Sequence, residues 1–431
     1  MRTQSLPLAD TAAALRTGDR SLRSHVDRTC DRIAAVEPDV RALVDEPERR
    51  ERLQSDAAAL EDEYDTDDRP PLYGVPVGVK DIVHVDGFTT RAGTALPPEL
   101  FQGPEATVVS ELKAAGALVL GKTVTTEFAG QGPGLTRNPH DVEHTPGGSS
   151  SGSAAAVAAG TCPLAIGTQT GGSVVRPAAF CGVVGFKPSF DRIPTDGVIT
   201  RSESLDHVGL FSQDVAGMAL AASVVCDDWT ADASPPEPPT LGVPEGPYLE
   251  RASDAALDAF EAQLDRLADA GYGIERVPAF EDFAETDRRR MHVSHGELAL
   301  VHGDWFDEYE SFYRTRMAER IRSGREVTTE QLIEGRAVLR ERREGLQERM
   351  DAASIDLWAC PAAPGPAPAG ISSTGDSVMN RPWTDAGLPA VTVPAGDVDG
   401  LPVGLQCVAR YGADERLLAW AEGVAAAVAP D

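Results

Sequence analysis

The sequence predicts an α/β fold built around a largely buried β-sheet. From Leu72 to about Ser223, short β-branched runs alternate with alanine-rich helical stretches and glycine turns. Helical spacing dominates before this segment, and short apolar strands return after Leu357. Such alternation is typical of α/β proteins. Because nothing separates two independent halves of the 431 residues, we expect one large core with an appended region.

The first 70 residues are expected to form a helical lead-in that packs on the outside of the core. Ile33, Val36 and Val40 illustrate the helical spacing of apolar residues among charged ones. The remainder, residues 71–431, is expected to be one domain with a core of residues 72–223 and 357–431. The expected strands of this core are Val75–Val79, Leu118–Leu120, Val183–Phe186, Leu357–Pro361, Leu388–Pro394 and Gly404–Val408.

Residues of about 245–355 are expected to form a helical cover over the sheet. A proline-rich segment, Pro235-Pro236-Glu237-Pro238-Pro239, comes before it and predicts a stiff surface connection. Ser253 can cap a helix that Gly271 ends, and a second long helix is predicted from about Thr329 to Met350.

The charge of the chain excludes some classes of partner. Acidic residues number 68 against 39 basic ones, which gives a formal net charge of -29. Such a surface repels nucleic acid and anionic membranes, so we expect neither as a partner. An acidic excess with only four lysines also suits a halophilic protein of an acidic proteome, because close ions screen its self-repulsion. This halophilic character is a hypothesis.

Cysteine usage and hydropathy predict a cytoplasmic location. The six cysteines are scattered without a CxxC pair, which is typical of reduced thiols in a large cytoplasmic protein. The first residues lack an apolar signal core, and no stretch reaches the roughly 18 uninterrupted apolar residues of a membrane span. We therefore expect a soluble, unexported protein. The oligomeric state stays open, with a homodimer as one option.

Two short motifs imitate ligand sites. Gly116–Thr123 fits the phosphate-loop pattern, but its variable positions form the predicted strand itself, whereas a phosphate loop must follow a strand. His140–His144 fits the zinc pattern HxxEH, but Pro139 and Pro146 interrupt the helix that would bring both histidines to one metal. We expect no nucleotide site, no metal and no cofactor.

A third motif, Gly148–Gly152, satisfies the GxSxG pattern of a nucleophile elbow and would make Ser150 the nucleophile. An elbow follows directly on a strand, whereas this motif follows a predicted loop. It also leaves a second glycine-serine cluster, Gly167–Ser173, unexplained. We therefore prefer an interpretation that uses both clusters.

A lysine upstream of the two clusters can supply the base of a hydrolase site that contains no histidine. Lys80 follows the apolar run Pro76–Val79, where burial can lower the lysine pKa from about 10.4 by several units and leave a neutral base. An ion pair with Asp81 or another acid is the structural alternative. In Thr170-Gly171-Gly172-Ser173, two glycines let backbone N–H groups converge beside a serine hydroxyl, as a developing oxyanion requires. An ordinary glycine turn explains the same residues.

Together, these motifs resemble the amidase signature family. The resemblance rests on Gly78–Asp81, Pro146–Ala158, Gly167–Ser173, Pro177–Pro188, Gly387–Ala390 and Leu401–Gln406, and covers nearly the whole chain. It implies the amidase-signature fold, a mixed central β-sheet sandwiched between layers of α-helices. It also implies an amidohydrolase that cleaves the C–N bond of a small-molecule carboxamide to carboxylate and ammonia through a seryl acyl-enzyme, without metal or cofactor.

The resemblance also implies roles for individual residues. Ser173 would be the acylated nucleophile, Ser149 the bridging serine in a cis peptide, and neutral Lys80 the base of a Ser-Ser-Lys triad. The oxyanion-hole N–H groups would come from Thr170, Gly171, Gly172 and Ser173. Substrate binding is expected at Ser149 and Arg176.

Two residues depart from the commonest form of the signature. Gln169 stands where many members carry aspartate, and Val175 stands where many carry arginine, with Arg176 one position later. This variant resembles the general bacterial and archaeal amidase branch. The alternative is the glutamine-amidase subunit of a tRNA-dependent amidotransferase, for which the chain looks short, and a further rival is a member that has lost activity and only binds. Arg176 could favour substrates with a carboxylate, because its planar fork suits that group, or could pair with a structural acid.

Overall fold

The computed structural model describes residues 2–130, 132–230 and 237–429. Among these residues, ten strands form one sheet in the order β2-β1-β3-β5-β4-β9-β10-β8-β6-β7. Strand β1 runs parallel to β2 and β3, and β6 runs parallel to β7 and β8, whereas the central pairs are antiparallel. The strands are β1 (Pro76–Lys80), β2 (Leu118–Thr123), β3 (Leu164–Gln169), β4 (Val184–Lys187), β5 (His207–Ser212), β6 (Leu241–Glu245), β7 (Ile274–Pro278), β8 (Leu357–Pro361), β9 (Ala390–Val398) and β10 (Leu401–Val408).

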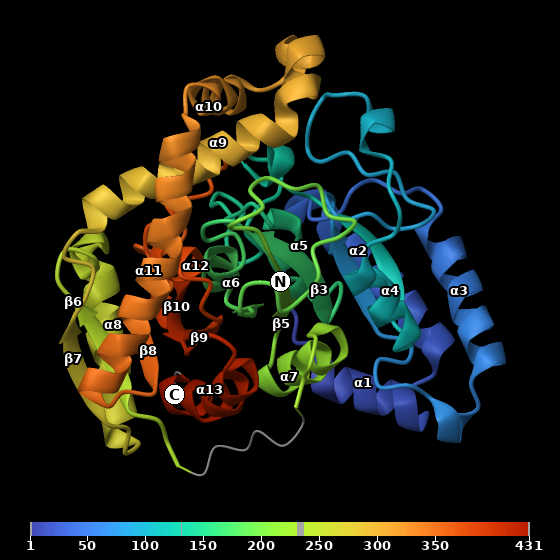
Figure 1. The fold of residues 1–431 in the computed structure, drawn as a ribbon. Helices are drawn as coiled ribbons and strands as arrows, with labels where there is room; N and C mark the ends of the chain where they lie inside the picture. The colour runs from blue at the N-terminus through green and yellow to red at the C-terminus, as the bar shows by residue number, and fades with distance from the viewer. Residues whose placement is uncertain (1, 131, 231–236, 430–431) are drawn as a thin grey trace.

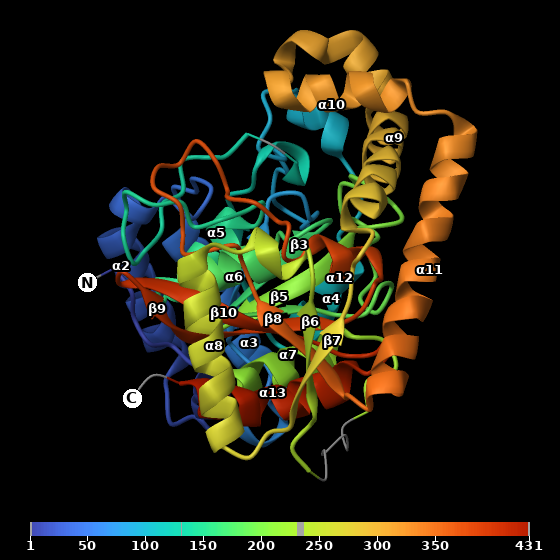
Figure 2. The same ribbon diagram turned by 90° about the vertical axis from the view of Figure 1, so that its left-hand side faces the viewer.

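Helices enclose this sheet in layers. Those of the described residues are α1 (Leu8–Thr17), α2 (Leu22–Val40), α3 (Arg49–Glu63), α4 (Thr107–Ala114), α5 (Ser151–Ala158), α6 (Val175–Cys181), α7 (Val215–Val225), α8 (Asp254–Asp269), α9 (Phe283–Tyr309), α10 (Thr315–Arg325), α11 (Thr329–Ala353), α12 (Arg381–Asp385) and α13 (Asp414–Val428). Figure 1 shows α1, α2 and α3 beside the β2 edge of the sheet. In Figure 2 the strands lie between α5 and α6 on one side and α7 and α13 on the other. The predicted α/β fold with a mixed, sandwiched sheet is confirmed.

The elements that the sequence marked most clearly form where predicted. Strands β1, β2, β4, β8, β9 and β10 overlap the expected apolar runs, and all of them pair within the same sheet. Helix α8 begins after Ser253, whose hydroxyl accepts the backbone N–H of Ala256. Helix α11 begins with a capping box between Thr328 and Gln331. A side-chain cap thus fixes each start, and the sequence indicated the one at Ser253.

The segment of about 245–355 is not wholly helical. Strand β7 lies inside it and extends the sheet beyond β6, which itself follows the proline-rich segment. Both strands are short and contain a proline, and three of the five β7 residues are exposed, so the alternation that signals a buried strand is missing. Pro235 and Pro236 of the predicted connection lie outside the described residues. The division into domains remains a prediction.

Three helices of the predicted cover stand apart from the sandwich. Figure 2 shows α9, α10 and α11 at one end of the molecule, outside the layers of the sheet. Helix α9 packs against both α10 and α11, and α12 lies next to α11. None of the helices in the described residues is both long and apolar enough to cross a membrane.

Sheet topology brings the first site residues together. Because β1 and β3 are parallel neighbours, their carboxyl ends lie at the same edge of the sheet. Lys80 is the last residue of β1, and Gln169 is the last residue of β3. Helix α5 begins at Ser151, directly after Ser149 and Ser150, and packs against both strands. Residues far apart in the sequence therefore meet at one edge.

Candidate active site

Lys80 is fully buried at the end of β1 and contacts hydroxyl groups. Its Nζ lies 2.7 Å from Ser149 Oγ, 2.9 Å from Ser150 Oγ and 2.7 Å from Thr168 Oγ1. The carbonyl oxygen of Thr168 is also within 3.3 Å. Burial lowers the pKa of Lys80 well below its ordinary value, because transfer of an ammonium ion out of water disfavours the charged form. The amine is thus suited to accept a proton.

The structural alternative for Lys80, an ion pair with Asp81, does not form. Asp81 instead pairs with Lys122, at a distance of 3.2 Å between the charged atoms. Lys122 also donates hydrogen bonds to the carbonyl of Val83 and to Thr90 Oγ1. The lysine of the apparent phosphate loop is therefore committed to buried protein groups, in agreement with the exclusion of a nucleotide site.

Ser149 and Ser150 take different positions around Lys80. The peptide bond between Gly148 and Ser149 is cis, as the family resemblance implied. Ser150 is fully buried, and its hydroxyl bonds to the backbone carbonyl and N–H of Thr168, at 3.2 Å each. Ser149, in contrast, lines a cavity. Ser150, the residue that the GxSxG pattern selects, therefore supports the lysine and does not line this cavity.

A cavity of about 440 Å³ brings the remaining predicted residues together. Ser149, Gly171, Gly172, Ser173 and Arg176 all line it. Ser173 lines this cavity and is 7% exposed. No histidine is present among the described residues that line the cavity, and the buried Lys80 is a base in hydrogen-bond contact with Ser149.

The loop that carries Ser173 is braced by the side chain of Gln169. Its Oε1 accepts the backbone N–H groups of Val174 and Val175, at 2.7 and 3.0 Å, and its Nε2 donates to Thr384 Oγ1 at 2.9 Å. Thr384 in turn donates to the carbonyl of Gly171, at 2.6 Å. Gln169 thus joins the end of β3, the start of α6 and α12. Its place in the signature pattern marked it as unusual, but these partners could not be read from the sequence.

A second set of contacts fixes Thr170. Its hydroxyl donates to Asp206 at 2.5 Å, and its carbonyl accepts a bond of 2.7 Å from Arg290. Arg290 also forms an ion pair with Asp385, which Arg342 shares. All three charged groups are buried, with side-chain exposures of 7% or less. No sequence pattern indicated this network, because its members come from separate helices.

Gly172 has no room for a side chain. A Cβ atom at this position would lie 2.3 Å from Asn380 Oδ1, closer than two non-bonded atoms can approach. Asn380 is itself held by hydrogen bonds to the carbonyl of Ala362 and to Gln406. Close approach of Asn380, the residue before α12, therefore requires glycine at this position.

Arg176 is buried in the wall of the same cavity, with an exposure of 5%. Its guanidinium donates to the carbonyl of Gly148 at 2.5 Å and to Thr374 Oγ1 at 3.2 Å. Within the described part of the chain it forms no ion pair, although Asp376 lies near enough to raise its pKa. Burial is the stronger effect and lowers the pKa of Arg176 to about 10. The pairing with a structural acid that the sequence left open is absent among these residues.

The HxxEH motif does not form a metal site. His140 contacts the carbonyl of Cys181 at 2.9 Å, and His144 contacts Asp141 at 3.0 Å. Neither histidine lies in a helix. No cluster of three potential metal ligands occurs in the part of the chain that the structure describes.

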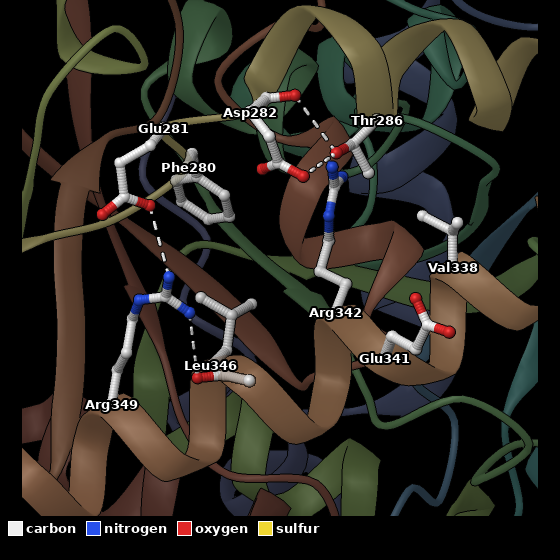
Figure 3. Close-up of a pocket in the computed structure, with 10 residues that line it drawn as sticks. Phe280, Glu281, Asp282, Thr286, Val338, Glu341, Arg342, Leu346 and Arg349 are labelled. Carbon is white, nitrogen blue, oxygen red and sulfur yellow. Dashed lines mark hydrogen bonds and ion pairs between the residues drawn. The ribbon is translucent and has the colours of Figure 1, made fainter.

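A second cavity lies between α11 and the segment that leads into α9, as Figure 3 shows. Its volume is about 250 Å³. Glu281 pairs with Arg349 across it, and Arg342 pairs with Asp385. None of the sequence-predicted site residues lines it, so the first cavity is the better candidate for catalysis.

The Amidase family profile matches residues 24–418. The chain belongs to the amidase family. Among curated proteins, a glutamyl-tRNA(Gln) amidotransferase subunit from Synechococcus sp. (strain RCC307) is 31% identical, and the alignment covers 96% of this chain and 95% of that protein. The corresponding protein from Symbiobacterium thermophilum is 33% identical over 94% of this chain and 93% of its own length.

Solved structures agree with this family assignment. A crystal structure of an amidase matches with a TM-score of 0.88 and 29% identity, covering 98% of this chain and all of that one. The native peptide amidase from Stenotrophomonas maltophilia matches with a TM-score of 0.84 and 26% identity, over 98% and 97% of the two chains. The amidase-signature fold predicted from the sequence motifs is therefore confirmed.

Proposed function

We propose that this amidase-family chain cleaves a carboxamide to a carboxylate and ammonia, with Ser173 as the acylated nucleophile. The observation that carries the proposal is the fully buried Lys80, whose Nζ lies 2.7 Å from Ser149 Oγ at the wall of the cavity that also contains Ser173. A neutral amine in contact with a serine hydroxyl is a base that can activate a nucleophile.

The hydrogen bonds around Lys80 orient its lone pair. A neutral amine has two N–H donors and one lone pair. The Thr168 carbonyl can only accept, and the Ser150 hydroxyl gives its own proton to that carbonyl and therefore also accepts. With the two N–H groups directed to these two acceptors, the lone pair is left for the hydroxyls of Ser149 and Thr168, and Ser149 can donate its O–H to it. Ser149 is then able to relay a proton.

The reaction follows from this relay. Ser173 Oγ attacks the amide carbonyl, its proton passes to Ser149, and the Ser149 proton passes to Lys80. Backbone N–H groups of residues 170–173 stabilise the oxyanion that forms. The relay then returns a proton to the leaving nitrogen, so that ammonia departs and an ester of Ser173 remains. Water attacks this ester along the same relay, which releases the carboxylate and restores the serine.

Arg176 is proposed to favour substrates that carry a carboxylate near the amide. It lines the cavity three residues after the nucleophile, and no acid is paired with it among the described residues. Because Arg176 also holds the carbonyl of Gly148, an Arg176→Ala variant is expected to lose activity on every substrate. The ratio of rates on carboxylated and neutral amides, compared between the variant and the wild type, therefore decides its role. An unchanged ratio would show that Arg176 does not select the substrate.

A second candidate function is the glutamine-hydrolysing subunit of a tRNA-dependent amidotransferase, which passes ammonia to a partner. The curated relatives favour this alternative over a free-standing amidase, because they are amidotransferase subunits. The apparent shortness of the chain does not argue against it, since the alignment covers 95% of the Synechococcus protein. Both candidates share the chemistry at Ser173 and differ in substrate and partner.

Ammonia release from the purified chain tests the proposal and separates the two candidates. Glutamine, succinamate and butyramide would be supplied to the chain alone and then with the other subunits of an amidotransferase. Turnover by the chain alone supports a free-standing amidase, whereas turnover of glutamine only in the complex supports the alternative. Ser173→Ala should abolish both activities, and Ser153→Ala, in a buried α5 serine outside the cavity, should not. Undiminished turnover by Ser173→Ala would overturn the proposal.

A further inference from the structure

The cavity that contains Ser173 is strongly cationic in a chain of net charge -29. Arginines from several separate segments of the fold contribute to its wall. They are Arg176, Arg201, Arg290, Arg316, Arg320 and Arg381. One acid, Asp376, lines the same cavity among the described residues, and its side chain is 64% exposed. Positive charge is thus concentrated where the reaction is proposed to occur.

Two of these arginines are neutralised by protein carboxylates. Arg290 pairs with Asp385 at 2.7 Å, and Arg381 pairs with Asp287 at 3.0 Å. Arg381 also lies 3.4 Å from Asp376. These ion pairs tie α9 to the segment around α12 and give both arginines a carboxylate partner, although Arg290 shares Asp385 with Arg342.

Arg201 and Arg320 have no such partners among the described residues. Arg201 is 8% exposed, its Nε is buried without a hydrogen bond, and its guanidinium makes a long contact of 3.4 Å with Ser294 Oγ. Arg320, on α10, forms no hydrogen bond or ion pair within the part of the chain that the structure describes. Asp206 is the one described acid whose charge acts on the buried Arg201, whereas Arg320 is half-buried and its charged neighbours are other arginines. A guanidinium whose N–H groups are only partly satisfied loses hydration without full compensation.

The two side chains also repel each other. Burial, with the neighbouring charges of Arg320 and Arg290, lowers the pKa of Arg201 to about 9, and the nearby Asp206 opposes this only in part. Burial likewise lowers the pKa of Arg320 to about 10, and nearby arginines, Arg290 first among them, contribute to the effect. Both groups still carry positive charge at neutral pH. An anion between them would relieve this repulsion.

We propose that Arg201 and Arg320 form a subsite for an anionic oxygen group of the substrate, a carboxylate or a phosphate, so that the physiological substrate is an anionic amide. Guanidinium groups match both anions in geometry and charge. Arg316, exposed on α10 at the same wall, adds long-range attraction. The inference rests on the proposed function, because it concerns the substrate of the same cavity.

This subsite is separate from Arg176. The charges that act on Arg176 are those of Asp376 and Arg381, whereas those that act on Arg201 are Arg320, Arg290 and Asp206. The two basic groups also come from different elements, since Arg176 lies on α6 and Arg320 on α10. A substrate that spans the cavity can therefore place its amide at Ser173 and an anionic group at Arg201 and Arg320.

Anion binding to the full chain tests the subsite without requiring turnover. Calorimetric titrations with glutarate and with inorganic phosphate would compare the wild-type chain with Arg201→Gln, Arg320→Gln and the control Arg322→Gln. Arg322 lies on the same helix but is exposed and paired with Glu310. We expect the first two variants to weaken binding about tenfold to a hundredfold, the loss typical of a charge-assisted hydrogen bond, and the control to bind like the wild type. The anion that binds more tightly, glutarate or phosphate, indicates whether the subsite prefers a carboxylate or a phosphate.

Kinetics then connect the subsite to the substrate. The ratio of kcat/KM for an anionic amide to that for butyramide should fall about tenfold or more in Arg201→Gln and Arg320→Gln. Unchanged binding and an unchanged ratio in both variants would overturn the subsite and leave the proposed function intact. If the chain binds the anion through these arginines but hydrolyses no amide, the result would support the subsite and overturn the proposed function.

Discussion

Replacement of Gln169 by alanine tests whether this side chain holds the oxyanion loop in place. The substitution removes one acceptor shared by the N–H groups of Val174 and Val175, and one donor to Thr384. Gln169 is 1% exposed, so water does not replace these bonds freely. Each buried group left without a partner costs about 1–3 kcal/mol, which gives about 2–6 kcal/mol for the two N–H groups. The same loop is proposed to supply the oxyanion donors, so we expect kcat to fall about 10²–10³-fold.

Two measurements and a control decide this prediction. Urea unfolding gives the change in the free energy of unfolding, and ammonia release gives kcat and KM. Gln263→Ala is the matched control, because Gln263 is equally buried, donates to the carbonyl of Ala395 and lies on α8 away from the cavity. It should lower stability while leaving kcat unchanged. An unchanged kcat in Gln169→Ala would refute the bracing role. Equal losses of kcat in both variants would show that the effect comes from lower protein stability and not from the position of the loop.

Three further predictions concern charge. Asp385→Asn should lower the free energy of unfolding, measured in urea, by about 3–5 kcal/mol, because Arg290 and Arg342 lose their buried counter-charge. An unchanged urea concentration at the midpoint of unfolding would contradict this prediction. Only neutral Lys80 accepts a proton, and burial lowers its pKa. We therefore expect kcat/KM to rise with pH and to reach a plateau below the ordinary lysine pKa of about 10.4. A rise of kcat/KM centred at or above pH of about 10.4 would argue against a neutral lysine base. The melting temperature should rise as KCl increases from about 0.1 to 1 M, because salt screens the excess of 68 acids over 39 bases; a flat or falling curve would remove the halophilic hypothesis.

Local sequence patterns indicated the short segments that form the candidate site. Lys80 ends an apolar strand, and Ser149 and Ser173 lie in glycine-rich turns, but the choice of these two serines over Ser150 came from the family resemblance. The family resemblance added the cis bond before Ser149, which no propensity indicates. Strands such as β1 and β4 and the capped helix α8 were predictable for the same local reason.

The contacts that position the site are long-range and could not be predicted. Thr384 is 215 residues from Gln169 in the sequence, and Arg290 is 120 residues from Thr170. Helix α9, which carries Arg290, buries Glu297 and His302 as well, so its buried face does not stand out as an apolar stripe. Its place beside the cavity follows from packing against α10 and α11, which is a property of the fold.

The central claim is that Ser173 carries the acyl group. An activated ester or amide substrate, quenched with acid during turnover and digested, would show the acylated peptide by mass spectrometry. We expect the mass of the acyl group on the peptide that contains Ser173, and none in Ser173→Ala. An adduct on Ser149 or Ser150, or continued turnover by Ser173→Ala, would contradict the assignment.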